Sequence, residues 1–199
     1  MFSLPSTTEF NVPLPKENFY RAMNVGAALR REFIDGVQQI AVVNDIKPRT
    51  ANVADGARVH EIFIVAATPK GDAVPEGVIR AICTANESPT VVYDTGAERA
   101  SVLVRGRLMS VLAPAELRLT GFNLDATWDS MLAQLVLGEL NGEGVVERIE
   151  RREKIKALTA EVASLDAKAR KERQISRRND LFAQLKKKQA ELAELEKEM

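Results

Sequence analysis

The sequence is poor in the residues that most often carry catalysis, metal binding and disulfide bonds. Its 199 residues include one cysteine, Cys83, and one histidine, His60. A single cysteine excludes an internal disulfide, and without a Cys/His cluster no segment has the ligand spacing of a structural zinc site. We therefore expect a protein without a metal or a cofactor, from a reducing compartment.

Aromatic residues and long apolar runs are also scarce. Aromatics make up 5% of the chain against 45% hydrophobic residues, so Val, Leu, Ile and Ala must fill most of the core. No segment approaches the roughly 18 apolar residues that a membrane span needs, and residues 2–5 include no basic segment ahead of an apolar one. We expect a cytoplasmic protein that does not contact a membrane.

Glycine and proline are absent from residues 147–199, where apolar residues recur at intervals of three and four. This spacing predicts one apolar stripe on a long helix. The same segment holds 15 Lys and Arg against 11 Asp and Glu, which leaves 13 and 17 for residues 1–146. The sequence thus predicts a body at residues 1–142 and a helical tail at residues 143–199, with an excess of four acidic groups in residues 1–146 and of four basic groups in residues 147–199.

The body has the pattern of a mixed sheet flanked by helices. Prolines forbid a helix in residues 1–15 and favour an extended strap, and an amphipathic helix then runs from Lys16 to the Asp35-Gly36 stop. Apolar runs and turn residues predict strands at 37–43, 59–66, 90–93, 99–104 and 108–112, a loop at 44–57, and helices beginning at Pro75 and spanning 126–140. The strands at 59–66 and 90–93 should be parallel, because a helix connects them. The fold class is therefore α+β or α/β.

The tail contains two apolar stripes that do not share a register. We expect them to mediate association, and they consist of Ile155, Leu158, Val162 and Leu165, then Leu181, Leu185, Leu192 and Leu195. Between residues 168 and 179 the chain either continues as one helix of about 80 Å or folds back as a hairpin that hides both stripes. Because no Gly or Pro marks a turn, we favour the continuous helix, whose stripe would need a partner.

Candidate catalytic residues are few. The order of helices and strands resembles restriction-nuclease cores, which need an Asp on one strand and Glu-x-Lys on the next to hold a metal and position water. Glu61 is not followed by a Lys two positions on, so a nuclease site would have to be a degenerate one. Its members would come from the acidic residues Asp55, Glu61, Asp94 and Glu98.

The lone histidine and the lone cysteine both have simpler interpretations. His60 and its neighbour Glu61 should point to opposite faces of a strand, so we expect a half-buried structural histidine. Cys83 lies among apolar residues of a helix, and we expect it to be packed. The sequence also has no Gly-rich phosphate loop.

The most suggestive polar feature is a basic cluster in the tail. We consider two interpretations: contact with a DNA backbone, or a solvated or partner-facing helix surface. The cluster comprises Lys168, Arg170, Lys171, Arg173, Arg177 and Arg178, and it is followed by Lys186, Lys187 and Lys188.

Segments at both ends of the chain resemble a family of bacterial proteins, the domain-of-unknown-function family 4391. The resemblance is carried by residues 14–20, 60–64, 171–179 and 185–188. It implies a context beside DNA methyltransferases and helicase-type or restriction-type subunits, and it implies no catalytic residues.

These observations lead to three hypotheses. The first is a non-enzymatic accessory subunit of a DNA restriction or phage-defence system, whose C-terminal helix associates with itself or with a larger methyltransferase-type or helicase-type partner. The second is a divergent metal-dependent nuclease, and the third is a DNA-binding module that uses the basic tail segment.

Overall fold

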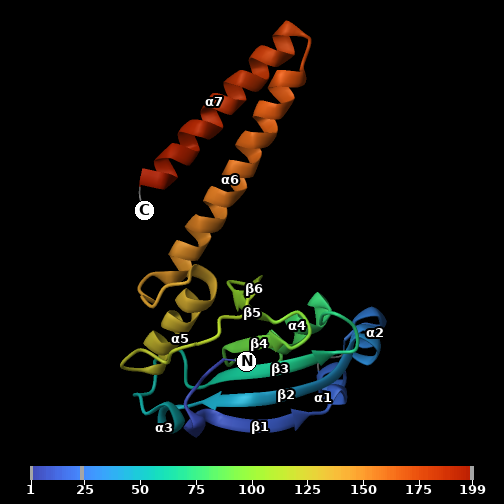
Figure 1. Ribbon diagram of the computed structural model, residues 1–199, viewed down its shortest axis with the longest axis vertical. Helices are drawn as coiled ribbons and strands as arrows, with labels where there is room; N and C mark the ends of the chain where they lie inside the picture. The colour runs from blue at the N-terminus through green and yellow to red at the C-terminus, as the bar shows by residue number, and fades with distance from the viewer. Residues whose placement is uncertain (1, 23–24, 198–199) are drawn as a thin grey trace. The chain divides into compact units, whose positions relative to one another are not determined.

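The computed structural model describes residues 2–22 and 25–197, and it divides the chain into two compact units. The first unit is Met1–Val145 and the second is Val146–Met199. The first contains a mixed sheet with helices, and the second is entirely helical in its described residues (Figure 1). Each unit is described separately below.

One six-stranded sheet forms the centre of the first unit, and its spatial order follows the order of the chain. The strands are β1 (Glu9–Leu14), β2 (Val37–Ile46), β3 (Ile62–Pro69), β4 (Thr90–Asp94), β5 (Arg99–Val104) and β6 (Arg107–Leu112). Neighbouring strands are antiparallel except β3 and β4, which are parallel and joined through a helix. The predictions of an α+β fold, of a mixed sheet and of this parallel pair are confirmed.

Helices complete both units. In the first unit they are η1 (Ser6–Thr8), α1 (Lys16–Ala22), α2 (Ala27–Gly36), α3 (Pro48–Ala51), α4 (Glu76–Cys83), α5 (Leu124–Leu132) and the π-helical turn η2 (Ala133–Leu137). In the second unit they are α6, whose bounds are Val145–Lys171, and α7 (Ile175–Lys197).

Helices α1, α2 and α4 cover one face of the sheet. Phe33 of α2 and Val78 of α4 are fully buried there, against Val37, Val65 and Val92 of the strands. The other face is apolar as well, since Ile62, Ile64 and Val91 are also completely buried. Strands β3 and β4 are thus buried on both faces, which explains their nearly continuous apolar sequence.

Several boundaries differ from the predicted ones. The expected strap is an edge strand, because β1 pairs with β2 through Val12 and Val42. The single helix expected from Lys16 is two helices, α1 and α2, and Met23, which we had placed on its apolar side, lies outside the described residues. The predicted loop at 44–57 contains the end of β2 and the short helix α3.

The ends of two other elements also differ from the predicted ones. Strand β3 begins at Ile62, so His60 and Glu61 precede the strand. The helix expected at 126–140 begins at Leu124, where the Asn123 side chain accepts a hydrogen bond from the Ala126 N–H at 2.9 Å. It ends before Gly138, whose φ of 77° is left-handed and favours glycine.

The second unit is a helical hairpin, so the continuous helix that we favoured is wrong. Residues 172–174 reverse the chain without Gly or Pro. The Glu172 carboxylate accepts a hydrogen bond from the Gln174 N–H at 2.8 Å, and the Gln174 carbonyl accepts one from the Arg178 N–H at 3.0 Å. A side chain therefore supplies the turn that we expected only from glycine or proline.

Candidate functional site

The apolar stripes of the tail lie largely between the two helices of the hairpin. Leu158 of α6 and Leu185 of α7 are 5% and 6% exposed, and Ala169 is fully buried. The other six residues of the two predicted stripes are half-buried. Two stripes on separate antiparallel helices need no common register, which accounts for the change of phase between them.

The three- and four-residue spacing of the second stripe falls on Lys188 between Leu185 and Leu192, and ion pairs explain the lysine at this position. Lys188 of α7 lies 3.2 Å from the Glu161 carboxylate of α6 and 3.3 Å from that of Glu191. These two hydrogen bonds raise the pKa of Lys188. A second ion pair, between Lys154 of α6 and Glu191 of α7 at 3.7 Å, also joins the two helices. Lys188 therefore links the two helices. The neighbouring Lys186 and Lys187 are exposed.

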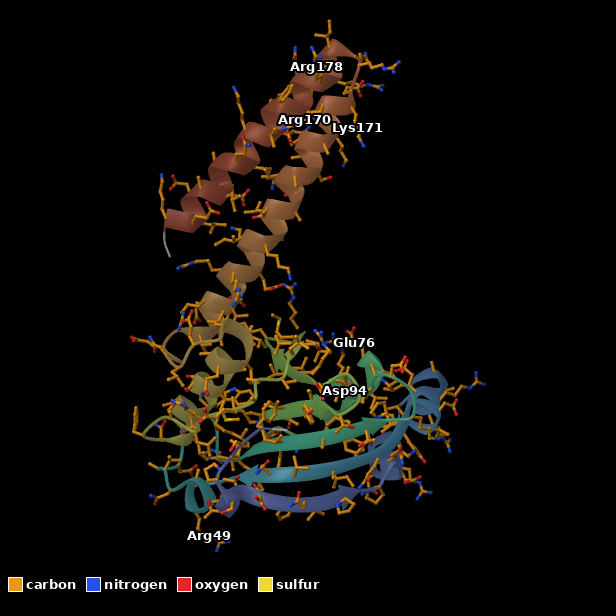
Figure 2. The ribbon with its side chains drawn as sticks, viewed as in Figure 1. Arg49, Glu76, Asp94, Arg170, Lys171 and Arg178 are labelled. Carbon is orange, nitrogen blue, oxygen red and sulfur yellow. The ribbon has the colours of Figure 1, made fainter. Side chains whose placement is uncertain are left out.

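The six residues of the predicted basic cluster gather at the turn of the hairpin. Figure 2 shows three of them, Arg170, Lys171 and Arg178, at the end where α6 passes into α7. All six are exposed, and only Arg170 forms an ion pair among the described residues, to Asp166 at 2.8 Å. The other five cations, on Lys168, Lys171, Arg173, Arg177 and Arg178, face solvent without a carboxylate partner in the described part of the chain.

Two apolar side chains accompany this cluster on α7. Ile175 is 67% exposed and Phe182 is 41% exposed. They are seven residues apart, or two helical turns, so they share one face of α7 with Arg178 between them. This mixed face, made of Ile175, Arg178 and Phe182, is called the outer α7 face below.

The four carboxylates considered for a nuclease site do not converge. Glu61 and Asp94 lie near opposite ends of the parallel β3–β4 pair, since Phe63 pairs with Thr90 and Ala67 pairs with Asp94. Among the described residues, no group of three or more His, Cys, Asp and Glu side chains is placed to hold a metal ion.

Two of these carboxylates serve the local backbone. Asp94 is buried and accepts hydrogen bonds from the backbone N–H groups of Val74, Gly96 and Ala97 at 2.8 to 3.2 Å. Asp55 accepts one from the Gly56 N–H at 3.0 Å, while the Glu98 side chain is exposed.

The lone histidine is more exposed than predicted, and the lone cysteine is packed as predicted. His60 is 66% exposed at its side chain because it precedes the strand, and its Nδ1 lies 3.0 Å from the Asp55 carboxylate. Burial raises the pKa of the Cys83 thiol to about 12. Burial therefore favours the protonated, less reactive form of this thiol.

A charged trio that the sequence interpretation missed lies at the end of β2. The Lys47 ammonium is 2.8 Å from Asp45 and 2.6 Å from Glu61, and its hydrogen bonds to Asp45 and Glu61 raise the pKa of Lys47. The pairing of Ile46 with Ile62 brings Lys47 beside Glu61. The Asp-x-Lys spacing of residues 45–47 could have indicated this trio, but we had placed these residues in a loop.

The trio borders a hollow of about 320 Å³ on the helix-covered face of the sheet. Eight of the 13 lining residues are apolar, and they come from β1, α1, β2, β3 and the end of α4. They are Phe10, Leu14, Phe19, Val42, Phe63, Val65, Ile82 and Ala85. The polar lining consists of Asp45, Lys47, Glu61, Asn86 and Thr90.

A half-buried carboxylate holds the loop after α3. Asp125 accepts hydrogen bonds from three successive backbone N–H groups, those of Ala57, Arg58 and Val59, at 2.8, 3.1 and 2.8 Å. Burial raises the pKa of Asp125, but the three hydrogen bonds and the nearby Arg58 guanidinium outweigh burial and lower it overall. The three successive N–H groups thus form an anion-binding loop, and the anion that they bind is the Asp125 carboxylate of the same chain.

The family described as Domain of unknown function (DUF4391) matches residues 2–192. The match spans the whole sheet and nearly all of the hairpin. The chain belongs to this family. Comparisons with curated proteins and with solved structures found no match. The prediction that the chain belongs to the DUF4391 family is therefore confirmed.

No helix in the described part of this DUF4391 chain combines the length and the apolar character that crossing a membrane requires.

Proposed function

We propose that this DUF4391 chain is a non-enzymatic accessory subunit that docks on a larger protein through the outer α7 face. The observation that carries the proposal is the exposure of Ile175 and Phe182 on one face of a helix whose leucines are all at least half-buried. Helices that dock in grooves are recognised by apolar anchors at this spacing. The unpaired arginines beside these anchors favour a groove with acidic borders.

The proposed partner is a methyltransferase-type or helicase-type subunit of a bacterial DNA restriction or phage-defence system in the cytoplasm. The context is supported by the resemblance of the sequence to this family. Docking is supported by the exposed outer α7 face of the hairpin. Light scattering of the isolated chain separates this proposal from self-association, since hetero-docking predicts a monomer.

The test is co-purification of the full chain with the subunits encoded beside it. Replacing Ile175 and Phe182 by serine should abolish co-purification while circular dichroism stays unchanged. A matched control replaces Gln184 and Lys187 by serine, at exposed positions of the same helix outside the outer α7 face. Co-purification that survives the serine variant, or that fails equally in the control, would contradict docking through this face.

DNA binding by the turn of the hairpin is a second candidate function, favoured by its five cations that have no carboxylate partner among residues 2–22 and 25–197. If all five contact phosphates, affinity for a DNA duplex should fall about 500-fold between 50 and 200 mM salt, from a slope of roughly −0.9 per contact. Fluorescence anisotropy measures this dependence. Replacing Arg173, Arg177 and Arg178 by glutamate should abolish binding, and an unchanged affinity would exclude the turn as a DNA site.

A further inference from the structure

Asp45, one of the residues that line the hollow beside the charged trio, has a buried carboxylate oxygen that the described residues do not satisfy. The Asp45 side chain is 9% exposed, and its Oδ2 receives the Lys47 ammonium at 2.8 Å. Its Oδ1 has no hydrogen-bond partner among the described residues. A buried unpaired carboxylate oxygen is costly, so it indicates a donor that is supplied from outside the chain.

Water is a poor occupant for the apolar side of the hollow. Its volume of about 320 Å³ equals roughly ten water molecules at about 30 Å³ each. A buried water needs two to four polar partners, and the side of the hollow formed by Phe19, Phe63 and Val65 offers apolar side chains. A cavity of this size with an apolar lining and a few convergent polar groups has the character of a small-molecule site.

The charges at the hollow determine what its occupant carries. Asp45 and Glu61 contribute two negative charges and Lys47 one positive charge, so the trio has a net charge of −1 when all three are ionised. Such a site repels an anionic head group and attracts a cationic one. Asn86 and Thr90 add neutral polar groups to the lining.

A divalent cation fits these surroundings less well. The Lys47 ammonium already occupies the position between the Asp45 and Glu61 oxygens that a cation bridging them would take. Mg²⁺ usually keeps several bound waters, each of which needs polar partners, whereas most of the lining is apolar.

We propose that the hollow is a binding site for a small amphiphilic amine, whose apolar body packs against Phe19, Phe63 and Val65 and whose protonated amine pairs with the Asp45 carboxylate. The ammonium joins the Asp45–Lys47–Glu61 trio and brings its net charge to zero. The site lies in the first unit of the chain and is independent of docking by the hairpin.

The experiment is a titration of the isotope-labelled full chain followed by two-dimensional NMR. The probes are hexylamine, hexanol and hexanoate, which share one apolar chain and differ in the charge of the head group. We expect saturable shifts of the amides around residues 61–65 and 82–90 with hexylamine. Hexanol and hexanoate should bind at least about tenfold more weakly, because they lack a charge-assisted hydrogen bond to Asp45.

Two variants and one control test the geometry. Asp45→Asn keeps the size of the side chain and should remove the preference for hexylamine over hexanol. Ala85→Phe places bulk at an exposed residue of the lining and should weaken hexylamine and hexanol alike. Asp72→Asn, at an exposed aspartate outside the lining, should change nothing.

Four results would overturn the proposal. They are the absence of saturable shifts with hexylamine, hexanoate binding as tight as that of hexylamine, a preference for the amine that survives Asp45→Asn, and hexylamine binding that Ala85→Phe leaves unchanged. In a separate arm, signal broadening by Mn²⁺ confined to residues around Asp45, together with no response to hexylamine, would assign the trio to a metal ion instead.

Discussion

The hydrogen bonds to Asp125 should make a measurable contribution to the stability of the first unit. Asp125→Ala removes the charged acceptor of three backbone N–H groups. Each hydrogen bond to a charged group contributes roughly 1.5–3 kcal/mol to stability. Ala57 and Arg58 are exposed, so water replaces part of the loss, whereas Val59 is buried. We expect the free energy of unfolding to fall by about 2–4 kcal/mol in Asp125→Ala and by about 1–2 kcal/mol in Asp125→Asn, which keeps one acceptor oxygen.

The effect should depend on pH with a definite sign. Because the folded state lowers the pKa of Asp125, its stabilising contribution is fully present above the ordinary carboxyl pKa near 4. The contribution is lost as the pH falls through the lower pKa of the folded state. The difference between the native chain and Asp125→Asn should therefore be largest at pH 7 and should shrink below about pH 4.

Urea unfolding followed by tryptophan fluorescence provides the assay. Trp128 is the one tryptophan of the chain, lies three residues after Asp125 on α5 and is 9% exposed. Its emission therefore reports the unit that contains the bonds. Equal urea midpoints for Asp125→Asn and the native chain at pH 7, or a difference that persists undiminished at pH 3, would refute the reasoning.

The remaining predictions concern the hairpin and the cysteine. Leu185→Ala removes a buried side chain and should destabilise α7 by at least about 2 kcal/mol, seen as roughly 30-fold faster hydrogen exchange in residues 175–197, whereas Phe182→Ala at an exposed position should have little effect. Similar exchange in the two variants would contradict the buried position of Leu185. Cys83 should react with a thiol reagent at neutral pH far more slowly than in the urea-unfolded chain, because burial raises its pKa to about 12. Equal rates in the folded and unfolded states would show that the thiol is accessible and ionises normally.

The sheet could be predicted because its signals are local. The runs around Val91 and Val102 are short, apolar and bounded by turn residues, and each forms a strand where the sequence places it. The edge strand β1 was missed because Pro5, Pro13 and Pro15 only exclude a helix. Its pairing with β2 is a contact across more than twenty residues, which no local pattern records.

The hairpin and the charged trio show two different limits of sequence interpretation. The turn at residues 172–174 is built by a glutamate side chain instead of glycine or proline, so only the phase change of the stripes indicated it. The trio depends on the register between β2 and β3, which brings Lys47 beside Glu61. Because the strand was expected to end at Val43, its Asp-x-Lys triplet was assigned to a loop.

The order of the sheet has a consequence for biosynthesis. Since the six strands lie side by side in the order in which they are translated, each new strand pairs with one that has already left the ribosome. The first three steps, from β1 to β4, each wait for one or two intervening helices, whereas the β4–β5 and β5–β6 connections are short turns that close quickly. A growing chain therefore exposes its newest strand as an open edge, and each following strand covers that edge as it emerges, until β6 ends the series.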